Sequence, residues 1–284
     1  SNRVCSHMTV SFSDEFDPVH SRCAVRDARQ ALAQPMSDQV RRYYDALTTT
    51  YQAGFGDVFQ GSRPESTEQL LQHIAQGARL QDGQSILDAG CGIGGPAVWM
   101  ARQYRLHVEA LTISDVQVTT ARQRVAAEGL SQRVAIRRGD FHRLSDFYAD
   151  SSFDRVLFLE SICHAQDYRQ VLQGAWRVLR PGGLLYIKDF YCQDFRHKPA
   201  QMAAREQDLV RLNEVYQLVL PDLPSLLDVL METGFRPRYI REPEYDSVFG
   251  PWIEYERLAG RSWSPNLSHH DLIAAVELLM LKPG

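Results

Sequence analysis

The chain has 284 residues, of which 44% are hydrophobic and 23% are charged, as is typical of a soluble globular protein. At about 150 residues per domain, this length allows one large domain or two small ones. The formal net charge of −4 gives no reason to expect a nucleic-acid or anionic-membrane partner. No apolar run reaches the ~18 residues that a membrane-spanning helix needs.

The five cysteines are scattered along the chain and form no Cys-x-x-Cys pair. This pattern argues against a zinc site or a disulfide framework, so we expect no metal site and a reducing, cytoplasmic location. Residues 1–7 have the composition of an expression-tag remnant before Met8, and we expect them to take no part in the fold.

Residues 8–62 are predicted to form a helical N-terminal arm that covers the ligand site as a lid. Residues 17–34 have a weak helical pattern, which Pro35 interrupts. Ser37 or Asp38 can cap a second helix that carries apolar side chains as far as Leu47. An arm of this kind could also join copies of the chain into a homo-oligomer.

Aromatic side chains are dense in the second half of the arm. They are Tyr43, Tyr44, Tyr51, Phe55 and Phe59. One interpretation is a stripe that packs into the core, and the other is the wall of a ligand pocket. Gly54 and Gly56 predict a bent segment in place of a regular helix, which favours a pocket wall for Tyr51 and Phe55.

Residues 63–284 are predicted to form the ligand-binding domain, a doubly wound α/β sheet. Ser66 opens a capping box for the first helix. Five apolar runs, which alternate with helical patterns, predict parallel strands. They are Ile86–Leu87, His107–Leu111, Val134–Ile136, Phe153–Leu159 and Leu184–Ile187. A last helix at Leu223–Thr233 and strands at Arg236–Ile240 and Glu277–Lys282 complete the domain.

An insertion over about residues 191–222 follows strand five. It is long for a connection from a strand to a helix, where ~2–6 residues are usual. Its apolar positions predict a helical lid above the ligand site. Its basic residues are expected to lie on a solvent-exposed helix face. The alternative is that they bind a diphosphate.

The segment from Asp88 to Pro96 joins the first strand to a helix through four glycines. Glycine lets a backbone approach a ligand closely, and proline suits the first turn of a helix. The segment also satisfies G-x-G-x-x-G, a weak signal for a dinucleotide. However, the Asp88 carboxylate would repel a pyrophosphate and would suit an ammonium or sulfonium group, which points to S-adenosylmethionine (SAM).

This segment resembles the first motif of class I SAM-dependent methyltransferases, most closely of the sterol C24-methyltransferases. Residues 43–56 resemble that family's aromatic N-terminal region. Leu159-Glu-Ser-Ile-Cys-His-Ala-Gln-Asp167 resembles its Glu-x-x-Cys-His-Ala-x-Asp stretch, and Val178-Leu-Arg-Pro-Gly-Gly183 its approach to strand five. The likeness spans about residues 40–190. It implies a Rossmann-like fold with SAM as cofactor.

The resemblance also implies a set of cofactor-binding residues. Those expected at the methionine part of SAM are Asp88, Gly90, Gly92 and Gly94, with Tyr44 and Glu160 also in the cofactor site. Thr112 and Gln117 would bind the ribose, since this chain lacks the acid that many class I enzymes place after strand two. Asp140 would accept from the adenine amine, with Phe141 packed beside it.

For the acceptor, the resemblance implies methylation of an alkene through a carbocation. Tyr51, Phe55 and Tyr191 are candidates to stabilise that cation through their ring faces. His164, with Glu160 as its neighbour, is the candidate base that takes up the final proton.

The chain departs from the sterol enzymes at two places. Phe55 stands where they carry Trp, and Gln60-Gly61 stand where they carry a His-Phe pair. A reshaped pocket favours relatives that act on isoprenoid side chains in bacterial secondary metabolism. An implied acceptor is a prenylated indole alkaloid of the teleocidin type, whose methylation could be coupled to cyclisation. The alternatives are a sterol, a prenyl diphosphate, or O- or N-methylation of a small molecule.

Overall fold

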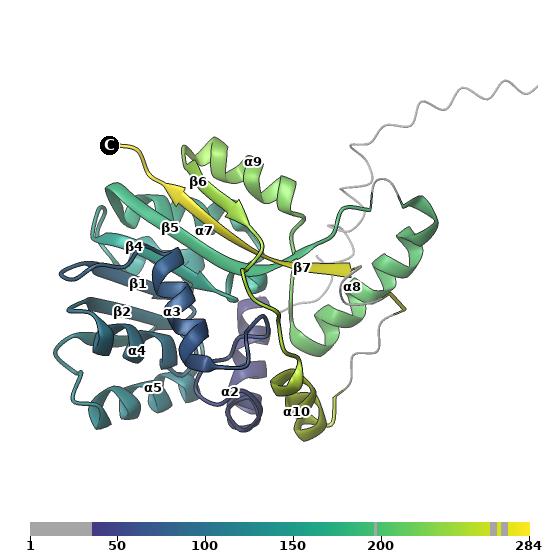
Figure 1. Cartoon of the computed structure of the whole chain (residues 1–284), viewed down its shortest axis with the longest axis horizontal. Helices are drawn as coiled ribbons and strands as arrows, with labels where there is room; N and C mark the ends of the chain where they lie inside the picture. Colours follow the sequence, from purple (N-terminus) through teal and green to yellow (C-terminus); the bar gives the residue numbers. More distant parts are fainter. Residues whose placement is uncertain (1–35, 196–197, 262–265, 268–271) are drawn as a thin grey trace, which may run out of the picture. The chain divides into compact units, whose positions relative to one another are not determined.

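Among the residues that the structure describes, the centre of the fold is a seven-stranded sheet (Figure 1), whose strand order is β3-β2-β1-β4-β5-β7-β6. The computed structural model describes residues 36–195, 198–261, 266–267 and 272–284. The predicted tag remnant and the helix predicted over residues 17–34 lie outside the described residues.

The first five strands run parallel, and β7 pairs antiparallel with β5 and β6. The strands are β1 Ser85–Ala89, β2 His107–Thr112, β3 Val134–Arg138, β4 Phe153–Leu159, β5 Leu179–Cys192, β6 Arg236–Arg241 and β7 Ile273–Leu281. This is the predicted doubly wound sheet. Because β1 lies between β2 and β4, the strand order reverses there, and the carboxyl ends of these strands form the crevice where such sheets bind ligands.

Helices cover both faces of the sheet (Figure 1). They are α2 Met36–Phe55, α3 Thr67–Gly77, α4 Gly95–Gln103, α5 Asp115–Ala127, α6 Leu144–Phe147, α7 Tyr168–Val178, α8 Met202–Tyr216, α9 Leu223–Thr233 and α10 Gly250–Ala259. Helices α3, α4 and α5 share one buried core, and α7 and α9 share another. Ile86 joins the first core and Leu87 the second, because successive side chains of a strand point to opposite faces.

Several predicted boundaries are confirmed. β4 and α9 begin and end at the predicted residues. Ser66 caps α3 as predicted, since its side chain accepts a hydrogen bond from the Gln69 N–H. None of the helices within the described residues combines the length and the apolar character that crossing a bilayer requires.

The prediction of a bent segment at Gly54 is wrong. Helix α2 continues unbroken to Phe55, and the chain turns only at Gly56, where φ is +71°. Gly54 serves packing, because a Cβ there would lie 2.9 Å from the backbone nitrogen of Tyr255 in α10. The missing side chain therefore lets α2 and α10 lie side by side, as Figure 1 shows.

Strand five is longer than predicted, and α10 was not predicted at all. β5 begins at Leu179 and passes through the Pro-Gly-Gly sequence, because a shift of register between Phe153 and Arg155 of β4 accommodates the additional residues. At its other end β5 continues to Cys192, so the insertion begins after the strand. Its helix, α8, packs over α2 and α10 as an apolar cover.

Candidate cofactor and active site

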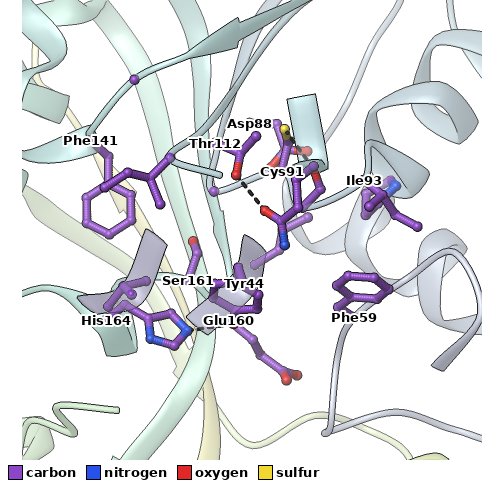
Figure 2. A pocket seen from close by; sticks show the side chains of 18 of the residues that line it. Tyr44, Phe59, Asp88, Cys91, Ile93, Thr112, Phe141, Glu160, Ser161 and His164 are labelled. Atoms are coloured by element: carbon purple, nitrogen blue, oxygen red, sulfur yellow. Dashed lines mark hydrogen bonds between the residues drawn. The ribbon is translucent and has the colours of Figure 1, made fainter. Parts of the chain in front are cut away.

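A cavity of about 850 Å³ opens at the carboxyl ends of β1, β2, β3 and β4 (Figure 2). Helix α2 and the connection that follows it, residues 56–63, close it from above; we call this connection the arm loop. Ten of the predicted site residues line the cavity. They are Tyr44, Asp88, Gly90, Gly92, Thr112, Gln117, Asp140, Phe141, Glu160 and His164.

The glycine turn places backbone at the floor of this cavity. Gly90 has a φ of +102°, and a Cβ there would lie 2.3 Å from the Cβ of Ser161. Glycine is therefore required at this position on both steric and conformational grounds. Gly94 caps α4 but does not line the cavity, because its open side faces Ala121 of α5 at 3.2 Å.

Asp88 is a buried group of the cavity whose hydrogen-bonding capacity is unsatisfied. Its side chain is 1% exposed, and neither carboxylate oxygen has a hydrogen-bond partner among the described residues. Burial raises the pKa of Asp88 to about 7. A buried carboxylate without a partner is costly unless a ligand supplies one, and the ammonium of a bound methionine moiety fits this requirement.

Thr112 and Gln117 lie together at the end of β2. The Thr112 hydroxyl donates to the side-chain oxygen of Gln117 at 2.6 Å, so the amide nitrogen of Gln117 is the group that could donate to a ribose hydroxyl. Ser114 caps α5 and donates to Asp45 of α2 at 2.7 Å. The arm helix is thus joined directly to the wall of the cavity.

Asp140 follows β3 and is held by His142. Both the backbone N–H and the ring Nδ1 of His142 donate to the same oxygen of Asp140, at 2.9 and 2.6 Å. Burial alone would raise the pKa of Asp140, but these hydrogen bonds lower it below its usual value. Asp140 is therefore an ionised acceptor, suited to an exocyclic amine, and Phe141 beside it packs edge-on against Phe158.

His164 is held between the arm and the lid. Its Nδ1 lies 2.9 Å from the carbonyl oxygen of Gln217, which ends α8, and its Nε2 lies 2.8 Å from the Tyr44 hydroxyl. Since a carbonyl can only accept, Nδ1 carries the proton and Nε2 accepts from Tyr44. Burial lowers the pKa of His164 to about 4, so the ring is neutral at physiological pH.

Glu160, in contrast, accepts hydrogen bonds from three donors. Its carboxylate accepts from the backbone N–H groups of Gly61 and Ser62 at 2.6 and 3.1 Å, and from the Lys188 ammonium at 2.5 Å. The residue has a φ of +52°. Glu160 thus joins the end of β4 to the arm loop and to β5.

Tyr51, Phe55 and Tyr191 lie outside the cavity lining. Tyr51 and Phe55 are 5% and 4% exposed within a cluster of aromatic side chains formed by α2, α8 and α10. Tyr191 is buried in the core that α7 and α9 share. The rings of Tyr44, Phe59 and Phe141 line the cavity, while Tyr51 packs behind Tyr44 and Phe59. The cation-stabilising role of Tyr51, Phe55 and Tyr191 stays a prediction.

Some residues of the site were not identified from the sequence. The arm loop contributes Asp57, Phe59 and Gln60 to the lining, and β5 supplies Lys188. The departure from the sterol enzymes at Gln60-Gly61 and a lysine in an apolar strand were the available signals. Within the described part of the chain, no three His, Cys, Asp or Glu side chains lie close enough to hold a metal ion, and Cys91, Cys163 and Cys192 are free and buried.

Comparison with known sequences identifies a family and a set of relatives that includes the following three. Residues 87–187 match the family described as "Methyltransferase domain". The chain is 32% identical to Methyltransferase GfsG of Streptomyces halstedii, over 69% of this chain and 84% of that protein. It is 32% identical to O-methyltransferase rstn1 of Aspergillus nomiae, over 72% of this chain and 91% of that protein. It is 31% identical to sterol 24-C-methyltransferase ERG6A of Gibberella zeae, over 64% and 50%, and so spans about half of that protein.

Many solved structures share the fold, and two of them show the extent of the likeness. The [4+2]-cyclase SpnF has a TM-score of 0.70 at 22% identity and covers 88% of this chain and 97% of its own. The geranyl diphosphate C-methyltransferase of Streptomyces coelicolor A3(2), in complex with Mg²⁺, geranyl diphosphate and S-adenosyl-L-homocysteine, has a TM-score of 0.68 at 15% identity. It covers 89% of this chain and 99% of its own.

Proposed function

The chain belongs to the class I SAM-dependent methyltransferases of the sterol 24-C-methyltransferase-like family. We propose that it is a C-methyltransferase that methylates an alkene carbon of an isoprenoid side chain. One observation carries the proposal. The catalytic candidate His164 is neutral, buried and hydrogen-bonded to an aromatic residue of the same cavity, Tyr44. This arrangement suits uptake of a proton after an uncharged acceptor has reacted.

Different residues of the cavity would bind different parts of the cofactor. Asp88 would hold the ammonium of the methionine moiety, Gln117 with Thr112 the ribose, and Asp140 the adenine amine. When bound, SAM supplies an electrophilic methyl group on a sulfonium sulfur. The protein need not deprotonate an alkene before transfer; it must hold the double bond in line with that methyl group.

The chain's own groups then act on the cation that transfer leaves on the acceptor. The faces of Tyr44 and Phe59 lie at the cavity and can stabilise a positive charge by ~2 kcal/mol or more when water is excluded. The proton that the acceptor loses can be taken by the Tyr44 oxygen while the Tyr44 proton passes to His164 Nε2, 2.8 Å away. A new alkene results, or a ring where an internal double bond captures the cation first.

Within this class we propose a bacterial isoprenoid acceptor of secondary metabolism, such as a prenylated indole alkaloid of the teleocidin type, with methylation coupled to cyclisation. The two departures from the sterol enzymes, at Phe55 and at Gln60-Gly61, support a reshaped acceptor site. We expect the enzyme to act in the cytoplasm, and its N-terminal arm to be the segment through which copies of the chain would associate.

The test uses labelled SAM and a panel of acceptors: uncharged prenylated indoles, a sterol, and geranyl diphosphate with and without Mg²⁺. We expect a new C–CH₃ group, located by NMR, on an uncharged prenyl chain, and turnover that EDTA does not change. Turnover only with geranyl diphosphate, lost with EDTA and restored by Mg²⁺, would contradict the proposed acceptor.

Methylation of oxygen is the second candidate, because one relative of similar identity is named an O-methyltransferase. In that reaction a base must act on a hydroxyl before transfer. A methyl group found on oxygen, with a rate that rises with pH, would favour this candidate.

A further inference from the structure

We propose that Glu160 and Lys188 position the arm loop over the cofactor pocket, and that Glu160 is not the base of the reaction. We call the pair, with its partners Gln60, Gly61 and Ser62, the latch. The proposal rests on SAM as cofactor, but it does not depend on which acceptor is methylated.

The latch joins segments that are distant in the sequence. Glu160 accepts from Gly61 N–H, 99 residues away, and Lys188 donates to the Gln60 side-chain oxygen and the Ser62 carbonyl at 3.0 and 2.6 Å. The Glu160 N–H also donates to the Lys188 carbonyl at 2.7 Å. The Lys188 side chain is fully buried and the Glu160 side chain 6% exposed, so water competes little with these contacts.

The backbone at Glu160 supports a role for its side chain. A φ of +52° is unfavourable for a residue that is not glycine, so the surrounding structure must hold Glu160 there. Its side chain supplies this restraint, since both carboxylate oxygens are bonded to the arm loop. Three of the about four lone-pair positions of this carboxylate already accept from the arm loop and Lys188, which leaves little of it to take a proton from a substrate.

The residues of the latch lie between the cofactor cavity and a second cleft. Gln60 and Glu160 line the cofactor cavity. Gly61 and Ser62 line a second cleft of about 1120 Å³, whose other side includes Tyr245. If the latch releases the loop, the cofactor cavity opens toward this cleft. Lys188 lines neither of them, so any effect of Lys188 on SAM must pass through its partners, Glu160 and the arm loop.

The experiment compares Glu160→Gln, Lys188→Met and the double variant with the wild type. The double variant removes both charges together, so it avoids leaving either one buried and unpaired. SAM dissociation constants are measured by calorimetry. Hydrogen–deuterium exchange of the Gly61 and Ser62 amides, read by mass spectrometry, reports on the loop without any acceptor.

The matched control lies at the opposite end of β4. Asp154 accepts from a backbone N–H of Ser85 at 2.8 Å and from Arg180 at 2.7 Å, and neither side chain lines the cavity. Asp154→Asn and Arg180→Met therefore break a carboxylate–cation pair of the same sheet that is more exposed than the latch. We expect them to leave SAM affinity and exchange in the arm loop unchanged.

For the latch variants we expect SAM to bind about tenfold more weakly in each, with the double variant no weaker than the single ones. The amides of Gly61 and Ser62 should exchange faster, while those of β4 stay protected. Wild-type SAM affinity and loop exchange in Lys188→Met and in the double variant would overturn the proposal. So would Glu160→Gln that binds SAM normally but loses turnover, since that pattern identifies a base.

Discussion

At the scale of single residues, Asp88 makes the most direct prediction. It is a buried carboxylate with no partner, and SAM would supply one. We expect Asp88→Asn, which has nearly the same shape, to weaken SAM binding at least tenfold, or ~1.4 kcal/mol, by calorimetry. Asp140→Asn is the companion variant, because it should weaken binding through the adenine end alone. Unchanged affinity in folded Asp88→Asn would remove the assignment.

His164 makes a prediction about the order of events. We expect His164→Ala to keep SAM affinity nearly unchanged, and to slow product formation or change which alkene or ring forms, by mass spectrometry and NMR. General-base groups contribute ~10²–10⁴-fold, so a slower rate within this range is expected. His73→Ala is the control, since His73 bonds to Glu277 outside the cavity.

The pH profile separates this role from that of an ordinary histidine. The pKa of His164 is about 4 in the folded protein, so Nε2 is available as an acceptor above about pH 5. At saturating SAM, turnover should therefore show no acid limb near pH 6.5. If His164→Ala loses SAM binding, or if such a limb is present in the wild type and absent in the variant, our division of roles fails.

At the scale of elements, the contact between the arm loop and α4 decides how the cavity closes. A Cβ on Gly95 would lie 2.0 Å from the carbonyl oxygen of Asp57 in the loop. Alanine has a higher helix propensity than glycine. In Gly95→Ala we therefore expect α4 to stay in place and the arm loop to move. SAM affinity should fall at least tenfold by calorimetry.

The control for this variant is Gly174→Ala in α7, where a Cβ would lie 3.5 Å from the Leu144 side chain, an ordinary contact. That variant should keep SAM affinity and could gain up to ~1 kcal/mol of stability from helix propensity. If Gly95→Ala binds SAM as the wild type does, the close approach of the loop is not needed for the cofactor site.

At the scale of the whole molecule, SAM should stabilise the fold in a pH-dependent way. The pKa of Asp88, about 7 when folded, is above the ~3.9 of an unfolded chain. In the ligand-free protein its contribution to stability is therefore fully present below about pH 4 and is lost as the pH rises through 7. A cationic ligand favours the ionised carboxylate and reverses this loss.

We therefore expect the rise in melting temperature caused by a fixed SAM concentration to be larger at pH 8 than at pH 6. A free SAM concentration of 100 times the dissociation constant raises the free energy of unfolding by ~2.7 kcal/mol. Differential scanning calorimetry of the wild type and Asp88→Asn measures both the shift and its pH dependence. An equal shift at both pH values in the wild type would mean that Asp88 does not face the cation.

The sequence by itself determined the parts of this protein that depend on near neighbours in the chain. The apolar run of β4, the cap at Ser66 and the ends of α9 are local features, and all are confirmed. The segment from Asp88 to Pro96 pointed to the cofactor, because a carboxylate before a glycine turn repels a pyrophosphate and suits a cationic ligand.

Only the tertiary structure decided which side chains meet. Gly54 signalled a bend in sequence, but in space it makes room for α10, about 200 residues later. Aromatic content alone could not separate Tyr44, which lines the cavity, from Tyr51, which packs behind it, since the direction of each side chain depends on what α2 packs against. The three donors to Glu160, on which our proposal for its role rests, come from segments that only the folded sheet brings together.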